Sequence, residues 1–286
     1  MSRPYDVIDA HCHYWEPARP DRPWDKDGWD TGPPLSVEQL LEDAAQAGVT
    51  KIVQVTPSIM GFDNRYAVEG AQRFPERVAG VIGRFDPTGE DVGPRLERFY
   101  AQEKILGLRL TLNKPPWNRW LDDGTLENLW REAARVGVPV TVTAAGRGAA
   151  LLDVARRHPD LRLVLDHMGV EHNAFSVADP DEDPFARWDL VLALAGAPNT
   201  YVKVSCVPEV SKEPYPFVNV HRYVRDLYER FGPGRLMWGS DYPPSLSACS
   251  YKQSVDYVDE LPFLDDDDKA QFFGGSLLRA VGVSVA

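Results

Sequence analysis

The first apolar stretch of the chain constrains the fold more than any other segment. Residues 7–13 (VIDAHCH) have the composition of a buried strand, yet they include a carboxylate and two histidines. Side chains alternate between the faces of a strand, so Asp9, His11 and His13 are predicted to share one face and Cys12 to point away. Two buried imidazoles on one face are costly unless they bind a partner. A metal ion or a substrate oxygen is the expected occupant, and backbone carbonyls are the alternative.

Strand-like and helix-like patterns alternate along the rest of the chain. Short apolar runs predict strands at residues 7–11, 51–56, 78–84, 107–112, 139–143, 161–166, 201–205 and 236–239. Helical patterns follow them, at residues 36–47, 64–73, 93–102, 126–135, 149–157, 183–195, 218–231, 251–260 and 266–280. Eight such units predict an α/β protein, a (β/α)8 TIM barrel that forms a single domain over residues 1–286.

The connections between these segments indicate where the active site lies. Connections that enter strands are short, whereas those that leave the first, fourth, sixth, seventh and eighth strands are long and rich in proline and aromatic residues. Active sites of TIM barrels lie at the C-terminal ends of the strands, where these long loops are expected.

Composition excludes several classes of partner. A formal net charge of −12 over 286 residues argues against nucleic acid and anionic membranes. No apolar run approaches the roughly 20 residues that span a bilayer. Three widely spaced cysteines imply no disulfide framework, and residues 1–6 leave no room for a signal peptide. A cytoplasmic protein that acts on a small molecule is expected, and a homo-oligomer stays open.

Polar residues recur at the predicted C-terminal ends of three strands. The first strand carries His11 and His13, His167 follows the sixth strand, and Asp241 follows the eighth. Three histidines and a carboxylate suit a divalent metal with an open position for water. They equally suit a metal-free site in which Asp241 is the base and the imidazoles are electrophiles. Taken singly, His167 could cap a helix and Asp241 could be a turn residue.

This set of motifs resembles the amidohydrolase superfamily, specifically its amidohydrolase-2 branch of lactonases and decarboxylases. The matching segments occur in family order across essentially the whole chain, at residues 8–13 (IDAHCH), 166–169 (DHMG), 239–243 (GSDYP) and 272–276 (FFGGS). The resemblance implies that His11 and His13 are metal ligands or carbonyl polarisers and that His167 faces the substrate oxygen. It implies that Asp241 is both a ligand and the general base for the attacking water.

One departure from the family pattern concerns the metal. Many relatives place a further histidine at the end of the fifth strand, but residues 140–146 here read VTVTAAG. The remaining ligands, His11, His13, Asp241 and His167, form a thinner shell than a typical zinc site. The branch member that opens 2-pyrone-4,6-dicarboxylate is understood to work without metal. One divalent ion, zinc or manganese, is expected, and a metal-free site stays open.

Charged residues inside predicted strands point to the substrate. Arg84 ends the third strand and Arg109 lies within the fourth, where a guanidinium must find a carboxylate from the protein or from a substrate. A structural ion pair with Asp9 or Asp86 is the alternative. Relatives that act on carboxylated lactones use arginines of this region, which favours substrate binding by Arg109. Lys203, in the middle of the seventh strand, is expected to be structural.

Aromatic residues on the long loops complete the predicted site. Trp15, Trp117 and Trp120 lie where they could wall a ring-shaped substrate, and Tyr242, beside Asp241, is expected to contact it as well.

The leading interpretation is a lactonase in which Asp241 activates water for attack on a cyclic carboxylic ester. The second is a metal-dependent, non-oxidative decarboxylase of an aromatic or muconate-like acid, against which the missing fifth-strand histidine counts. The third is a barrel that only binds a ligand. The set of buried ionisable groups argues against that reading, because such groups carry a stability cost.

Overall fold

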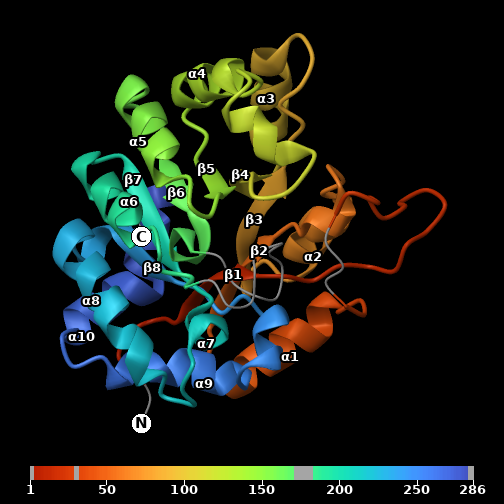
Figure 1. The fold of residues 1–286 in the computed structure, drawn as a ribbon. Coiled ribbons are helices and arrows are strands. Elements are labelled where there is room, and N and C mark those ends of the chain that lie inside the picture. The colour runs from red at the N-terminus through yellow and green to blue at the C-terminus, as the bar shows by residue number, and fades with distance from the viewer. Residues whose placement is uncertain (1–2, 29–31, 171–182, 283–286) are drawn as a thin grey trace.

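Eight parallel strands form one sheet whose order follows the sequence, which confirms the predicted TIM barrel. The computed structural model describes residues 3–28, 32–170 and 183–282. The strands are β1 (Ile8–Cys12), β2 (Lys51–Val55), β3 (Val78–Arg84), β4 (Ile105–Thr111), β5 (Val140–Thr143), β6 (Leu163–Leu165), β7 (Thr200–Val204) and β8 (Leu236–Trp238). Helices surround them in the ribbon view (Figure 1).

Most helices begin and end close to their predicted bounds. The helix expected at 183–195 begins at residue 188, the one expected at 266–280 is divided, and a short helix at 207–210 was not predicted. They are α1 (Val37–Ala47), α2 (Arg65–Arg73), α3 (Val92–Tyr100), α4 (Glu127–Val136), α5 (Gly148–Arg157), α6 (Trp188–Ala193), α7 (Val207–Val210), α8 (Val218–Phe231), α9 (Tyr251–Asp256), α10 (Asp266–Ala270) and α11 (Ser276–Val281). In α1, the Ser36 hydroxyl accepts the amide of Gln39, and Gly48 ends the helix in a left-handed conformation.

Side-chain alternation divides the core into two parts. Residues of six strands form one cluster inside the barrel: Ile8, Ala10, Val53, Val55, Ile82, Val164, Tyr201 and Met237. The intervening strand residues pack outward against the helices in a larger cluster. Because Tyr201 points into the barrel and side chains alternate, Lys203 and Ser205 also point inward. Lys203 lies nearer than Tyr201 to the C-terminal ends of the strands, and Ser205 lies nearer still. The C-terminal ends of the strands form the mouth of the barrel.

A bulge in β1 changes which residues share a face. The register of β1 against β2 shifts between Asp9 and Cys12, which reverses the alternation of the strand. Asp9 therefore points outward and accepts hydrogen bonds from Ser240 and from the Tyr251 hydroxyl of α9, the latter at 2.6 Å. The prediction that Asp9 shares a face with His11 is wrong. Cys12 points away from the mouth as predicted, with its thiol on the Val53 carbonyl.

The barrel closes between β1 and β8 at the mouth. The Asp241 amide donates to the His11 carbonyl at 2.8 Å, and the His13 amide donates to the Tyr242 carbonyl at 2.8 Å. The segments 8–13 and 239–243, two of the motifs found in the sequence, are thus hydrogen-bonded to each other where the barrel closes.

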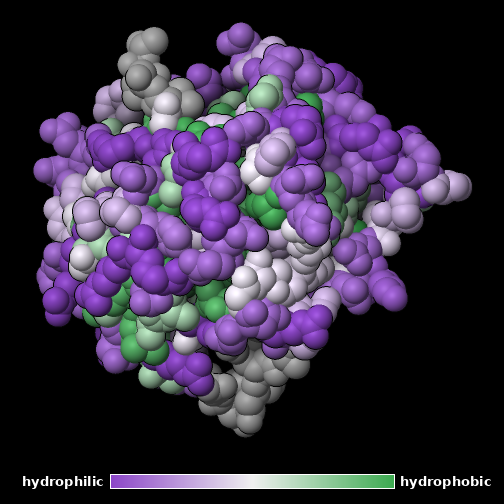
Figure 2. Space-filling model, turned by 90° about the horizontal axis from the view of Figure 1, so that it is seen from above, coloured by the Kyte–Doolittle hydropathy of each residue, from purple (hydrophilic) through white to green (hydrophobic). Residues whose placement is uncertain are grey.

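Within the described residues, no helix is both long and apolar enough to cross a bilayer. The face shown in Figure 2 is mostly hydrophilic, with small and separate hydrophobic patches.

Candidate active site

Three of the predicted catalytic residues form a compact buried cluster at the mouth. His11 lies on β1, His167 lies in the short 3-10 turn Asp166–Gly169 after β6, and Asp241 follows β8. Each offers one ligand atom, and these atoms lie within 4.8 Å of one another. His167 and Asp241 both have φ of 54°, a left-handed conformation that is uncommon outside glycine. Such strain is typical of functional sites, where the surrounding structure enforces it.

His13 joins this cluster through Asp241 rather than as a member of the triplet. Its Nδ1 lies 2.6 Å from the Val55 carbonyl, and its Nε2 lies 3.1 Å from Oδ1 of Asp241. A carbonyl oxygen only accepts, so Nδ1 carries a proton and Nε2 is the nitrogen that faces the carboxylate.

Electrostatics make Asp241 an anion among imidazoles. Burial by itself raises the pKa of Asp241, but His167, His13 and His11 together hold this pKa well below its ordinary value. Burial is also the largest influence on His11, whose pKa it lowers to about 3. At neutral pH the centre therefore combines a carboxylate with a neutral His11 imidazole.

The cluster fits a divalent cation by its donor set and by its unpaired atoms. Within the described residues, His11 Nε2 and Asp241 Oδ2 are buried without a hydrogen-bond partner. Buried polar atoms are normally paired, and imidazole with carboxylate is a ligand set that zinc and related ions accept. The end of β5 contributes Thr143 and no histidine.

Asp166, which the sequence reasoning did not assign to the site, is the centre of a buried network. Four groups lie 3.1–3.2 Å from its carboxylate oxygens: Arg109 Nε, Lys203 Nζ, His11 Nδ1 and Thr143 Oγ1. Burial by itself raises the pKa of Asp166, yet Lys203 and His11 hold it well below its ordinary value. Its sequence signals were its position immediately before His167 and its place in the DHMG segment, residues 166–169.

This network orients His11. Because the carboxylate of Asp166 accepts at Nδ1, neutral His11 presents Nε2 to the mouth, 3.5 Å from Oδ1 of Asp241. A carboxylate that fixes the tautomer of a histidine in this way is the usual support for a metal-binding or polarising imidazole. Lys203 is fully buried in the network, as its predicted structural role requires.

The two buried arginines have different partners. Arg109 forms an internal ion pair with Asp166, so it has a protein carboxylate. Arg84 donates to the Gly61 carbonyl and to the Thr111 hydroxyl, each at 2.8 Å, and its guanidinium lies 4.8 Å from the Trp117 ring centroid. In the described part of the chain no carboxylate forms a salt bridge with Arg84. Burial, followed by repulsion from Arg109, lowers the pKa of Arg84 to about 9.

Neither arginine pairs with the carboxylates named as alternatives in the sequence. Asp9 is bonded to Ser240 and Tyr251, and a side-chain oxygen of Asp86 accepts from the Thr88 amide at 2.9 Å.

The predicted aromatic residues divide between the mouth and the core. Trp15 is buried against Ile59 and Met60, and its indole Nε1 has no partner among the described residues. Trp117 stacks on Arg84 as described, whereas Trp120 is partly buried against the outer core.

Tyr242 points away from the cluster. Its hydroxyl donates to Asp43 of α1 at 2.6 Å, and its ring stacks on Tyr251 of α9 at 4.5 Å between centroids. The structure therefore does not bring the Tyr242 side chain to the cluster, although the sequence reasoning expected it to contact the substrate. The left-handed conformation of Asp241 turns the chain so that the adjacent side chain faces the helices.

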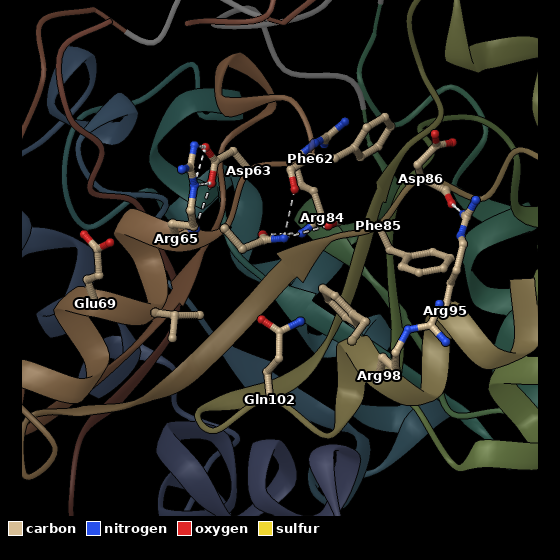
Figure 3. Close-up of a pocket in the computed structure, with 13 residues that line it drawn as sticks. Phe62, Asp63, Arg65, Glu69, Arg84, Phe85, Asp86, Arg95, Arg98 and Gln102 are labelled. Carbon is tan, nitrogen blue, oxygen red and sulfur yellow. Dashed lines mark hydrogen bonds and ion pairs between the residues drawn. The ribbon is translucent and has the colours of Figure 1, made fainter. Parts of the chain in front are cut away.

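A cavity of about 580 Å³ lies between α2, α3 and the end of β3. Arg84 is among the residues that line it, but none of the predicted catalytic residues is. Two of its charged side chains already have protein partners: Arg65 pairs with Asp63, and Arg95 donates to the backbone of Asp86 (Figure 3). The chemistry of the chain is therefore expected at the mouth.

Known proteins are similar to this chain along nearly its whole length. The family model described as Amidohydrolase matches residues 8–276. An L-fucono-1,5-lactonase of Burkholderia ambifaria is 31% identical over 281 residues, which are 94% of this chain and 93% of the relative. A 4-sulfomuconolactone hydrolase of Rhizobium radiobacter is 23% identical over 85% of this chain and 77% of the relative. The structure of an amidohydrolase from Burkholderia multivorans with bound zinc superposes with a TM-score of 0.80 at 19% identity, covering 98% of this chain and 100% of that one.

Proposed function

Because the chain belongs to the amidohydrolase family, we propose that it is a hydrolase that opens a lactone ring with an activated water. The observation that carries this proposal is the buried carboxylate of Asp241, which is ionised and has one oxygen without a partner in the described ranges. Such an oxygen can accept a proton from a water molecule held in the cluster. Two relatives are named for lactone hydrolysis, of a sugar lactone and of a sulfomuconolactone.

We propose that one divalent ion, zinc or manganese, is held by His11, His167 and Asp241, with His13 beside them. The unpaired Nε2 of His11 and Oδ2 of Asp241 support this, and a structural relative contains zinc. When bound, such an ion supplies Lewis-acid polarisation of the ester carbonyl.

The protein side chains account for the proton movements of the reaction. The Asp241 carboxylate accepts a proton from water as the water oxygen bonds to the carbonyl carbon. The imidazoles of the cluster face the developing oxyanion. The bond between the carbonyl carbon and the ring oxygen then breaks, and Asp241 returns its proton to the leaving alkoxide. The product is the open-chain hydroxy acid, and Asp241 is again a carboxylate.

Arg84 indicates the class of substrate. A buried guanidinium without a carboxylate partner gains most from an anionic or electron-rich group of a ligand. Arg84 is the last residue of β3, at the end of the barrel that also carries the predicted catalytic residues, and its guanidinium lies against Trp117. We therefore propose a carboxylated or otherwise polar lactone.

The decarboxylase that the sequence left open has less support. The fifth-strand histidine typical of such decarboxylases is absent, and the two relatives described above are named as lactone hydrolases.

Proton release from a panel of sugar, muconate and pyrone lactones tests the proposal. The wild type is expected to open at least one class, and Asp241→Asn to lower kcat by about 10²–10⁴-fold. Near-normal turnover by Asp241→Asn would exclude the mechanism, and release of carbon dioxide would identify a decarboxylase. Metal analysis of protein purified without chelator, with activity after stripping, tests the ion.

A further inference from the structure

Glu209 lies on the far side of the mouth from Arg84. It is on α7, which begins directly after the C-terminal end of β7 and the residues Ser205 and Cys206. In a barrel of eight strands in sequence order, β7 is four positions from β3, and these strands are therefore diametrically opposed. The ribbon view places α7 and β3 on opposite sides of β1 (Figure 1).

No described residue forms a hydrogen bond with the carboxyl of Glu209. Both of its oxygens are buried without a hydrogen bond, and so are the hydroxyls of Ser245 and Tyr257. A buried carboxyl without a donor is costly in the folded protein. Burial raises the pKa of Glu209 well above its ordinary value, and the negative charge of Asp241 raises it further. The energetic cost of this arrangement is typical of a group kept for a ligand.

Contacts of neighbouring residues place α7 beside the catalytic cluster, and α7 also lies against the turn Pro244–Ser247. At the start of α7, the Ser205 hydroxyl lies 3.0 Å from Nδ1 of His167, and the Cys206 thiol lies 3.6 Å from the His167 carbonyl. After β8, the amide of Ser245 donates to the carbonyl of Asp241 at 3.1 Å. The loops that hold Glu209 and Asp241 are thus parts of one wall of the mouth.

We infer that the carboxyl of Glu209 binds a hydroxyl group of the substrate. This inference rests on the proposed lactonase function and narrows it to hydroxylated lactones. A hydroxyl can donate to a carboxyl whether or not the carboxyl is protonated, whereas an anionic substituent would be repelled by nearby Asp241 and drawn to Arg84. The two sides of the mouth therefore select different substituents of one ring.

A pair of substrates tests the assignment: a hydroxylated aldono-1,5-lactone and unsubstituted δ-valerolactone. The measured quantity is the ratio of their kcat/KM values, in the wild type, in Glu209→Gln and in Glu209→Ala. Glu209→Ala is expected to lower this ratio by about 10- to 100-fold, mainly through KM of the hydroxylated lactone. Glu209→Gln keeps a carbonyl acceptor, so its ratio is expected to lie between those of the wild type and of Glu209→Ala. Glu229→Gln, on the exposed outer side of α8, is the matched control and is expected to leave the ratio unchanged.

Each alternative role gives a different result. Equal losses of kcat/KM on both lactones leave the ratio unchanged and overturn the inference. They would mean that Glu209 supports Asp241 or the fold. An unchanged ratio without any loss also overturns it. Thermal unfolding adds a second measurement: Glu209→Ala is expected to keep or raise the melting temperature, and a large decrease would show a structural bond. If the wild type opens neither lactone nor any other of the panel, the proposed function fails first.

Discussion

Arg84 and Arg109 occupy matching positions on neighbouring strands, yet the protein uses them differently. They are direct partners in the register of β3 and β4, and both are buried, with 3% and 5% of their surface exposed. Arg109 meets a carboxylate, Asp166, inside the barrel. Arg84 meets a carbonyl, a hydroxyl and an indole ring. The charge of Arg109 is therefore paired within the fold, whereas the charge of Arg84 stays available for a ligand.

The difference shows how a buried ionic group can be assigned to structure or to function. The residue type and the local strand pattern are the same in both cases, and only the tertiary partner differs. Removing one member of a satisfied pair leaves an uncompensated buried charge, while removing an unpaired charge removes a cost. Stability measurements should therefore separate the two arginines more sharply than activity measurements alone.

The largest effect is expected for Asp166→Asn, because the change leaves both Arg109 and Lys203 without a carboxylate. The free energy of unfolding should fall by about 3–5 kcal/mol, measured by urea denaturation. Asp153→Asn, which breaks an exposed pair with Arg157, is the control and should cost at most about 1 kcal/mol. A similarly small cost for Asp166→Asn would mean that the buried network contributes little.

Arg109→Met should cost less, about 2–3 kcal/mol, since Lys203 remains 3.2 Å from Asp166 after the change. The same urea experiment measures it. A protein as stable as the wild type would contradict the structural role of Arg109 and return it to the substrate-binding candidates.

Arg84→Met should change the substrate preference without lowering the stability of the protein. The free energy of unfolding should stay the same or rise, because the buried cation that is removed has no carboxylate partner in the described ranges. The kcat/KM ratio of a carboxylated lactone to a neutral one should fall by about 10- to 100-fold. If Arg84→Met were as destabilising as Arg109→Met, the contrast between the two arginines would disappear.

The smallest effect concerns pH. Burial lowers the pKa of Arg84 from its ordinary value of 12.5 to about 9, so the cation is present below about pH 9 and is lost as pH rises through it. The preference of the wild type for the carboxylated lactone should therefore decline above about pH 9. Between that pH and 12.5 the unfolded state binds more protons at Arg84, so this residue makes the unfolding free energy rise with pH. Arg84→Met should show neither dependence, and an identical pH profile in the variant would exclude Arg84 as the cause.

The sequence predicted the barrel and the position of its mouth well, for a physical reason. Strand ends in a parallel barrel converge, so polar residues at the ends of β1, β6 and β8 meet whatever the details of the loops. The convergence of His11, His167 and Asp241 was predicted in this way. Asp9 was misplaced because a single bulge reverses the alternation of a strand, and no local pattern announces a bulge.

Other features of the site depend on partners that are distant in sequence. Tyr242 was expected at the substrate, but the backbone conformation of Asp241 directs it to α1. Asp166 and Glu209 are ordinary acidic residues in the sequence. Only the packed structure shows that the first has several donors and that the second has none among the described residues.

The seam between β1 and β8 links the site to the dynamics of the barrel. Its two mouth hydrogen bonds are made by the backbones of His11, His13, Asp241 and Tyr242. Any fluctuation that parts these strands also separates the Asp241 carboxylate from both imidazoles. A ligand that bridges those side chains binds only the closed seam and stabilises it by mass action. The amides of His13 and Asp241 should then exchange with deuterium more slowly when a substrate analogue is bound, so the chemistry and the closure of the barrel are one cooperative unit.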